Sequence, residues 1–135
     1  MKPIKVFALI ALFFSISSFK PTDDLKWLGW DEGYKLAQKK RKIVMIDCYT
    51  EWCGWCKRMD KDTYANDKVQ TSLEQFVCVK IDAEQNRDLA KTYKINGFPS
   101  TVFLKANGQL IEVIPGYLPP SDFLKLLDNM LSKSE

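Results

Sequence analysis

The sequence of 135 residues contains no histidine, and of its four cysteines only Cys53 and Cys56 form a C-x-x-C pair. A structural zinc site usually needs four ligands, from two such pairs or from one pair with histidines. A zinc site within one chain is therefore disfavoured. The chain also lacks repeats and low-complexity segments, and its 46% hydrophobic and 27% charged residues are typical of one folded domain.

No apolar run is as long as the ~20 residues that a membrane-spanning helix needs. The longest run has 14 residues between Lys5 and Lys20, after a short basic start and before a polar stretch, and this order matches a secretory signal. We expect residues 1–18 to be a signal peptide, 19–24 a linker and 25–135 the mature domain. An uncleaved N-terminal anchor is the alternative, because the cleavage region offers serines rather than alanines. No cysteine lies there, which excludes a lipid-modified one.

The net charge gives no reason to expect a nucleic-acid partner. Removal of residues 1–18 takes away Lys2 and Lys5 and no acidic residue, so the formal charge of +3 falls by two. A nearly neutral domain has no electrostatic attraction for a phosphate backbone. Export also changes how the cysteines are interpreted, because thiols outside the cytosol tend to oxidise.

The apolar pattern predicts alternating strands and helices. Residues 43–50 and 76–82 are apolar runs with hardly a polar break, which is typical of strands buried on both faces. We expect an edge strand at 25–28 and a hairpin of strands 101–106 and 110–114 with its turn at 107–108. We expect five helices: one from about Asp31 to 42, one that starts at Cys53, one capped by Asn66, one over 86–93, and one over 121–133 capped by Ser121. We therefore expect an α/β fold with a mixed central sheet of about five strands, helices on both faces and a hairpin at one edge.

Three interpretations of the C-x-x-C pair remain after zinc is disfavoured: a structural disulfide, a redox centre, or transient metal handling between two chains. A disulfide that closes so short a loop constrains the unfolded chain only weakly. A helix N-terminus stabilises a thiolate, and one helical turn brings the second sulfur within reach of the first. This favours a redox centre in which Cys53, the more exposed thiol, attacks and Cys56 resolves the mixed disulfide.

Three segments, VMIDCYTEWCGWCK, KIDAEQN and INGFPSTVFL, follow one another in the order found in the thioredoxin family. From about Lys42 to Leu131 the sequence resembles that family, and most closely the thioredoxin-like C-terminal domain of the thiol:disulfide interchange protein DsbD and related small exported proteins. The resemblance implies a thioredoxin fold and an exported, periplasmic oxidoreductase that reduces or isomerises protein disulfides. It implies no cofactor beyond the cysteines, and a membrane-bound electron donor as partner.

The resemblance also implies roles for individual residues. Asp47 matches a buried acid that assists proton removal from the resolving thiol, and burial would raise its pKa; an aspartate hydrogen-bonded at a strand end is the alternative. Pro99 matches the cis-proline of the family, and without the family it would be an ordinary loop residue. The catalytic residues are then Cys53, Cys56 and Asp47, with Cys53 and Cys56 forming the redox-active disulfide; the substrate-binding residues are Trp52, Trp55, Phe98 and Pro99; no residue is expected to bind metal.

The sequence departs from thioredoxin between its two cysteines, where Gly54 and Trp55 replace Gly-Pro. We expect Trp55 to be substrate-contacting surface rather than a partly buried core residue. Strongly oxidising enzymes of this kind use a histidine near the cysteines, and the chain has none, so we expect a reductase or isomerase. A thioredoxin-fold module that binds extended segments without turnover is the alternative function.

A second departure concerns the surroundings of Asp47. The resemblance places Cys78 where thioredoxins have a lysine near the buried acid, while Lys80 lies two residues further along the strand. Without that lysine, Asp47 would titrate higher and the resolving step would depend more on pH. Cys48 should point to the opposite face of its strand from Asp47, so we expect Cys48 and Cys78 to be unbridged thiols in the core.

Overall fold

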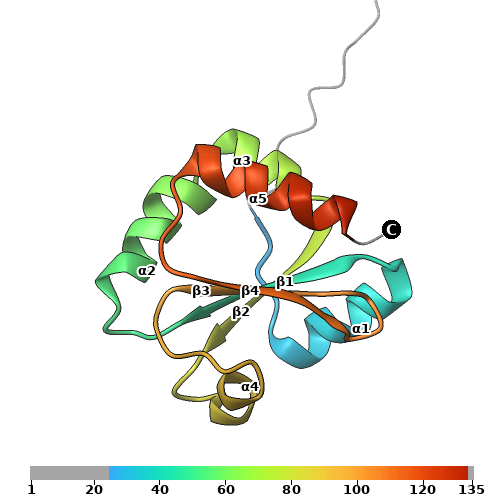
Figure 1. Ribbon diagram of the computed structural model, residues 1–135, viewed down its shortest axis with the longest axis horizontal. Coiled ribbons are helices and arrows are strands. Elements are labelled where there is room, and N and C mark those ends of the chain that lie inside the picture. The colour runs from blue at the N-terminus through green and yellow to red at the C-terminus, as the bar shows by residue number, and fades with distance from the viewer. Residues whose placement is uncertain (1–24, 134–135) are drawn as a thin grey trace, which may run out of the picture.

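Four strands form one mixed sheet at the centre of the computed structural model (Figure 1), which describes residues 25–133. The strand order is β2-β1-β3-β4, with β1 and β2 parallel and the other two pairs antiparallel. The elements are α1 (Trp30–Lys40), β1 (Ile43–Tyr49), α2 (Gly54–Met59), η1 (Asp60–Tyr64), α3 (Asp67–Leu73), β2 (Phe76–Asp82), α4 (Arg87–Thr92), β3 (Ser100–Leu104), β4 (Leu110–Pro115) and α5 (Pro120–Ser132). The expected α/β fold, with a hairpin of β3 and β4 at one edge, is confirmed.

The expected fifth strand at 25–28 is reduced to a single bridge. The N–H of Leu28 donates to the carbonyl of Cys78, and the N–H of Lys80 donates to the carbonyl of Leu28, each over 3.0 Å. The chain leaves the sheet immediately afterwards, because α1 begins at Trp30. One residue of pairing attaches this segment to the outer edge of β2 without extending the sheet.

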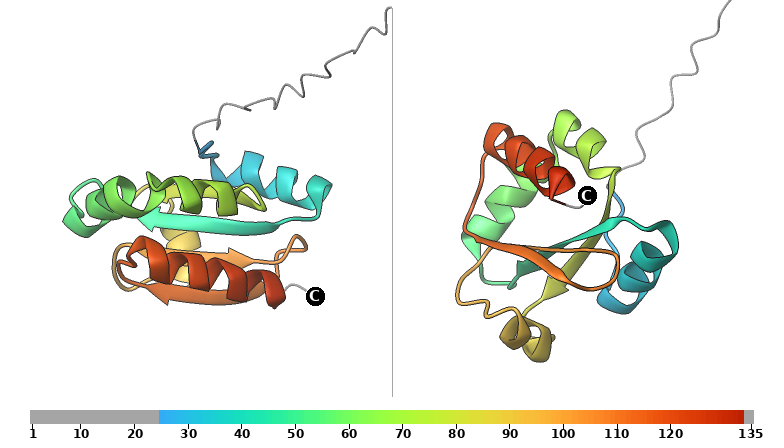
Figure 2. Two further views of the ribbon diagram at one scale, coloured as in Figure 1. Left: turned by 90° about the horizontal axis from the view of Figure 1, so that it is seen from above. Right: turned by 45° about the vertical axis from the view of Figure 1, so that its right-hand side comes forward.

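Helices cover both faces of the sheet, as the views in Figure 2 show: α1 and α4 lie on one side and α2, α3 and α5 on the other. Alternate residues of β1 supply the two cores, since Met45 packs with α3 and α5 while Val44 and Ile46 pack towards α1. At the α1 contact, a Cβ on Gly33 would collide with the Val79 side chain. A glycine is therefore needed for α1 to approach β2 this closely.

The ends of two helices test the expected caps. Asn66 caps α3 as expected, because its Oδ1 accepts hydrogen bonds from the N–H groups of Lys68 and Val69. The prediction that Ser121 caps the last helix is wrong, because α5 begins at Pro120 and no side chain caps it. Proline suits the first helical position because its φ is already fixed and it has no N–H to satisfy, so Ser121 lies inside the first turn.

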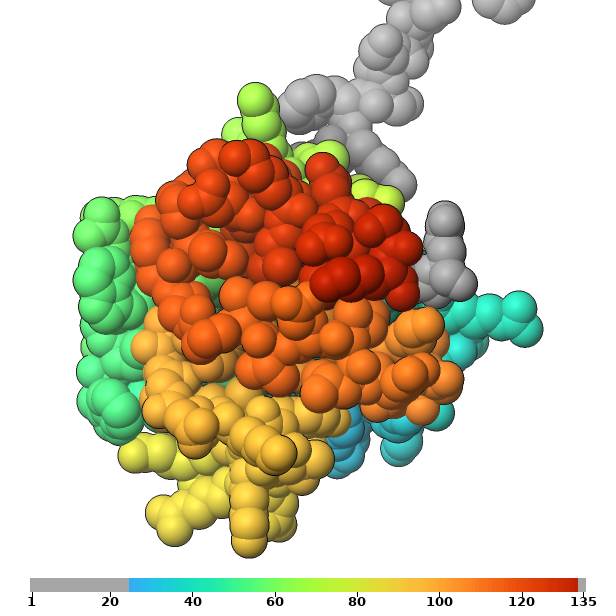
Figure 3. Space-filling model, viewed as in Figure 1, coloured from blue at the N-terminus to red at the C-terminus, as the bar shows by residue number. Residues whose placement is uncertain are grey.

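A π-helical segment, η1, continues α2 without a break and was not expected from the sequence. Thr63 and Tyr64 at its end are buried, and the Thr63 hydroxyl donates to the carbonyl of Leu118 over 2.6 Å. Such segments change the direction of side chains relative to an α-helix. In Figure 3 the α2–η1 region forms one edge of the face whose centre is filled by β4 and α5.

The expected signal peptide and linker, residues 1–24, lie outside the described residues, as do 134–135. Within residues 25–133, the helices are too short or too polar to cross a membrane.

Candidate active site

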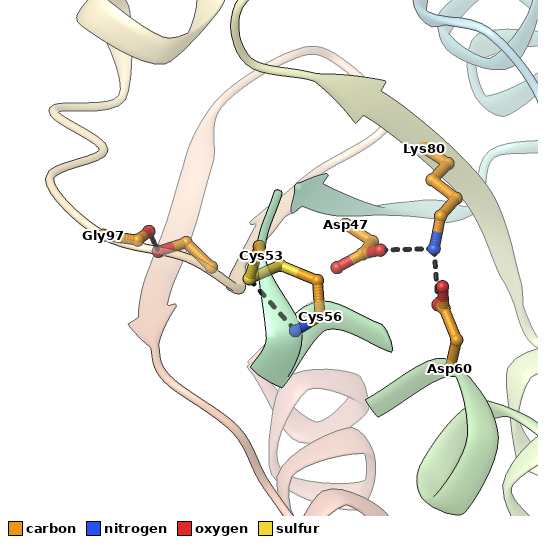
Figure 4. Close-up of a disulfide and its surroundings, with 7 residues drawn as sticks. Asp47, Cys53, Cys56, Asp60, Lys80 and Gly97 are labelled. Atoms are coloured by element: carbon orange, nitrogen blue, oxygen red, sulfur yellow. Dashed lines mark hydrogen bonds and ion pairs between the residues drawn. A yellow bond between two sulfur atoms is a disulfide. The ribbon is translucent and has the colours of Figure 1, made fainter. Parts of the chain in front are cut away.

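Cys53 and Cys56 form a disulfide at the start of α2, with their Cα atoms 5.3 Å apart (Figure 4). β1 ends at Tyr49, and a short turn in which the N–H of Cys53 donates to the carbonyl of Thr50 brings the chain to the helix. Cys53 is the N-cap of α2, and its Sγ accepts a hydrogen bond of 3.0 Å from the N–H of Cys56. The strand end and the helix start therefore fix the position of both sulfurs.

The expected difference in exposure between the two cysteines is absent, since Cys53 is 5% exposed and Cys56 4%. Both cysteines are therefore buried in the disulfide-bonded state. What distinguishes them is the backbone N–H that points at Sγ of Cys53. A donor in this position stabilises a thiolate, so the geometry favours Cys53 as the nucleophile once the disulfide is reduced.

Asp47 lies in the middle of β1 with only 2% of its side chain exposed, and Lys80 from β2 donates to its Oδ2 over 2.7 Å. The expectation that Asp47 lacks a lysine partner is therefore wrong. The parallel register pairs Asp47 with Lys80, so Lys80 rather than Cys78 reaches the acid. Burial raises the pKa of Asp47, and the Lys80 ammonium offsets this only in part.

The second carboxylate oxygen of Asp47, Oδ1, is buried and has no hydrogen-bond partner among the described residues. In Figure 4 the carboxylate lies between the disulfide and Lys80, and this free oxygen is on the side of the disulfide. An unpartnered buried acceptor is costly unless something else uses it. Its position suits the acceptance of a proton from Cys56 after the disulfide is reduced.

Lys80 connects Asp47 to a second carboxylate at the molecular surface. Its ammonium donates to Oδ1 of Asp60, at the start of η1, over 2.6 Å, and Asp60 is 47% exposed. Burial lowers the pKa of Lys80, but the two carboxylates outweigh this effect and leave that pKa above its ordinary value. Lys80 is therefore a permanent cation beside Asp47 at neutral pH.

The loop before β3 contains a cis peptide bond between Phe98 and Pro99, as the resemblance implies. The Ser100 hydroxyl donates to the carbonyl of Gly97 over 2.7 Å, and the carbonyl of Pro99 accepts from the N–H of Gly116. Gly116 has a φ of +93°, a conformation that glycine adopts without strain. The first bond closes the loop on itself, and the second attaches it to the residue that follows β4.

An exposed tryptophan directly precedes each of the two disulfide cysteines. Trp52 is 67% exposed, contacts Phe98 edge-on at 5.9 Å and donates from its indole N–H to Glu84. Trp55 is 55% exposed and lies 5.5 Å from the ring of Tyr117, so it is a surface residue rather than part of the core, and its contact with substrate stays a prediction. We call Trp52, Trp55, Phe98 and Tyr117 the aromatic rim.

The remaining two cysteines behave as expected. Cys48 belongs to the core towards α1 and Cys78 to the core towards α5, so they lie on opposite faces of the sheet and are not bridged. Burial raises the pKa of each thiol to about 12. Within residues 25–133, no group of three or more cysteine and acidic side chains is arranged to hold a metal ion.

The structure thus brings all the expected site residues to one end of the sheet, around the disulfide. Sequence reasoning missed Lys80 as the partner of Asp47 and did not single out Asp60, and it left open whether Tyr117 is core or contact surface. For Lys80 a signal was present: the two buried runs begin at 43 and 76, and pairing them from their first residues matches Asp47 with Lys80. Asp60 and Tyr117 carry no such signal.

The comparisons with known proteins point in the same direction. A model of the thioredoxin-like domain matches residues 30–131. The chain is 33% identical over 100 residues to the thiol:disulfide interchange protein DsbD of Yersinia pestis (strain Pestoides F), which covers 70% of this chain and 17% of that relative. The chain therefore spans about a sixth of the length of such curated relatives.

Two solved structures illustrate the likeness in fold. A thioredoxin from Thermus thermophilus superposes with a TM-score of 0.76 and 27% identity, over 83% of this chain and 91% of that one. The reduced C-terminal domain of DsbD from Neisseria meningitidis superposes with a TM-score of 0.62 and 24% identity, over 73% of this chain and 91% of that one. The expected thioredoxin-like architecture is confirmed.

Proposed function

The chain belongs to the thioredoxin-like domain family, and we propose that it is an exported thiol:disulfide oxidoreductase that reduces or isomerises disulfides in other proteins. One observation carries the proposal: the Cys53–Cys56 disulfide forms at the start of α2, with a backbone N–H on one sulfur. The buried carboxylate of Asp47 lies beneath it. This arrangement supplies a stabilised nucleophile, a resolving thiol and a proton acceptor.

In the proposed reaction, the Cys53 thiolate attacks one sulfur of a substrate disulfide. A mixed disulfide forms, and the other substrate sulfur leaves as a thiolate. Cys56 then loses its proton to Asp47 and attacks Sγ of Cys53, which releases the second substrate sulfur. The substrate gains two electrons, and the enzyme is left with the Cys53–Cys56 disulfide.

The raised pKa of Asp47 suits its proposed part in this reaction. A carboxylate with an ordinary pKa near 3.9 would be too weak a base to take a proton from a thiol at neutral pH. Burial raises the pKa of Asp47 and so makes the carboxylate more basic, while the Lys80 ammonium opposes this effect. The net effect is a pKa raised above its ordinary value, which is the direction that a general base for a thiol requires.

The aromatic rim and the cis-proline loop are the proposed substrate-binding surface. Trp52 directly precedes Cys53 and contacts Phe98, and Trp55 directly precedes Cys56 and contacts Tyr117. Large exposed rings offer contact area at little cost in side-chain entropy. An extended protein segment that carries the target disulfide would lie between them, against Pro99.

The compartment and the electron donor are also proposals. The curated relatives are named thiol:disulfide interchange proteins, but this chain spans only 17% of the one described above. Each turnover leaves Cys53 and Cys56 oxidised, so the proposed reaction needs an electron donor that reduces this disulfide again. A membrane-bound donor in the periplasm fits a domain exported by residues 1–18, because an oxidising compartment has no soluble thiol pool to recharge it.

Activity and trapping assays on cysteine variants test this function. With a chemical thiol as reductant, the wild type should accelerate the reduction of a protein disulfide such as that of insulin, and Cys53→Ser should not. Cys56→Ser should instead accumulate mixed disulfides through Cys53. If Cys53→Ser keeps full affinity for extended segments and no turnover is seen with any variant, the chain is a binding module.

A further inference from the structure

The segment before α1 places an aromatic ring over the active-site lysine. The two backbone hydrogen bonds of Leu28 hold the segment against the edge of β2, next to Lys80. Trp27 then lies with its ring centroid 4.7 Å from the Lys80 ammonium and contacts Tyr64 edge-on at 4.9 Å. The family model matches only from residue 30, so Trp27 is outside it.

The Lys80 ammonium is held between two carboxylates and three rings. Asp47 and Asp60 accept its hydrogen bonds, and the rings of Tyr49 and Tyr64 lie 5.2 and 5.4 Å from it, in addition to Trp27. The titratable and charged groups that face the Asp47–Lys80 pair are Asp60 and Tyr64 from η1, Tyr49 from β1 and Cys56 from α2.

One side of this arrangement opens to solvent. A pocket of about 320 Å³ adjoins the lysine, and Trp27 forms part of its wall. The Lys80 side chain is 20% exposed whereas Asp47 is 2% exposed. A lysine has a flexible stem, and the adjoining pocket offers space into which the ammonium can move away from Asp47. The ring face of Trp27 attracts the cation and makes its present position more favourable.

We propose that Trp27 is a positioning residue for the resolving step: its ring holds the Lys80 ammonium against Asp47, and so sets the pH range in which Asp47 accepts the proton of Cys56. This inference rests on the proposed function, in which Asp47 is the base. The segment before α1 that contains Trp27 and Leu28 is then part of the redox site as well as part of the sheet edge.

Removal of the Trp27 ring should raise the pH at which the resolving step begins. With leucine at this position the apolar wall remains but the attraction for the cation is lost. The ammonium then spends more time in the pocket, and Asp47 loses part of the charge that lowers its pKa. Asp47 therefore keeps its proton to a higher pH, and the resolving step begins at a higher pH. A cation–π contact of ordinary strength corresponds to a shift of about half a pH unit.

The resolving step can be isolated with a chromogenic aromatic disulfide. Mixing it with the reduced full-length chain releases one coloured thiolate when Cys53 attacks and a second when Cys56 resolves the mixed disulfide. The rate of the second phase, measured by stopped flow against pH, gives a midpoint that belongs to the coupled Asp47–Cys56 pair. We expect this midpoint to rise by about half a unit in Trp27→Leu, and by less in Trp27→Phe, which keeps a ring and an apolar contact.

Trp30→Leu is the matched control, because Trp30 is also half-buried and stacked on a tyrosine, but it packs in the other core. Its midpoint should equal that of the wild type. In a Lys80→Met background, Trp27→Leu should cause no further shift, since the cation is gone. An unchanged midpoint in Trp27→Leu, or an equal shift in Trp30→Leu, would overturn the proposal.

A second readout does not depend on turnover. In the oxidised protein Cys53 and Cys56 do not titrate, so the carboxyl carbon of Asp47 can be followed by NMR against pH. Trp27→Leu should raise the midpoint of Asp47 and Trp30→Leu should leave it unchanged. If the wild type releases only the first thiolate, the proposed function has failed, yet this titration still decides whether Trp27 acts through Lys80.

Discussion

Lys80→Met should remove the one cation that Asp47 contacts and leave a carboxylate that is 2% exposed without a counter-ion. Methionine keeps most of the apolar stem, so the change acts mainly on charge. Loss of one partner from a buried ion pair is strongly destabilising, because the other charge stays buried and uncompensated. Lys80→Met therefore tests how much the Asp47–Lys80 pair contributes to the free energy of unfolding.

The size of the loss has an upper limit, because Asp47 can take up a proton instead of staying charged. At pH 7, protonation of a group with an unfolded-state pKa of ~3.9 costs about 4 kcal/mol, at ~1.4 kcal/mol per pH unit. Burial already raises the pKa of Asp47 in the wild type, so part of this cost is present before the substitution. We expect Lys80→Met to lower the free energy of unfolding by about 2–3 kcal/mol at pH 7.

The loss should also depend on pH. Since the pKa of Asp47 is raised on folding, its contribution to stability is fully present below the unfolded-state pKa and is lost as the pH rises through the folded-state pKa. Lys80→Met raises the folded-state pKa further, so the difference from the wild type should grow with rising pH and shrink towards pH ~4.

Urea unfolding of the oxidised protein at a series of pH values measures this difference, with Cys53 and Cys56 kept from titrating by their disulfide. Lys61→Met, at an exposed position in η1, is the matched control and should leave the pH dependence unchanged. A loss for Lys80→Met that is the same at all pH values, or too small to measure at pH 7, would refute the reasoning.

Three further predictions concern the buried thiols, the helix caps and the contact between α1 and β2. In the reduced, folded protein an alkylating reagent at neutral pH should add to two of the four thiols, because burial raises the pKa of Cys48 and Cys78 to about 12; three or four adducts by mass spectrometry would contradict this. Asn66→Ala should cost about 1 kcal/mol of stability in thermal unfolding, whereas Ser121→Ala, which removes no cap, should change it by less than about 0.5 kcal/mol. Gly33→Ala should cost about 1–3 kcal/mol, because the added methyl meets a β2 side chain; an unchanged melting temperature would show that α1 can move away.

Much of the architecture could be predicted from the sequence because the signals are local. The two buried runs gave β1 and β2 within a residue, and Asn66 has the side chain that a helix start needs. The C-x-x-C pair after a buried strand located the redox centre. Each of these features depends on residues that are close together in the chain, so the sequence pattern alone is enough to predict it.

The features that sequence reasoning missed depend on contacts between distant segments. Lys80 reaches Asp47 because of the register between two strands, and it reaches Asp60 across a separation of 20 residues in the chain. Ser121 was misjudged for a local reason, since a preceding proline is an equally good helix start.

The reduction potential of the Cys53/Cys56 pair tests the central claim most directly. The oxidised protein would be equilibrated with buffers of reduced and oxidised glutathione or dithiothreitol, and the thiols trapped and counted. With no histidine beside the cysteines, we expect a reversible two-electron transition near the ~ −270 mV of thioredoxin, as a reductase requires. A potential approaching ~ −120 mV would mean that the protein donates disulfides, and a pair that cannot be reduced and reoxidised would contradict a redox function altogether.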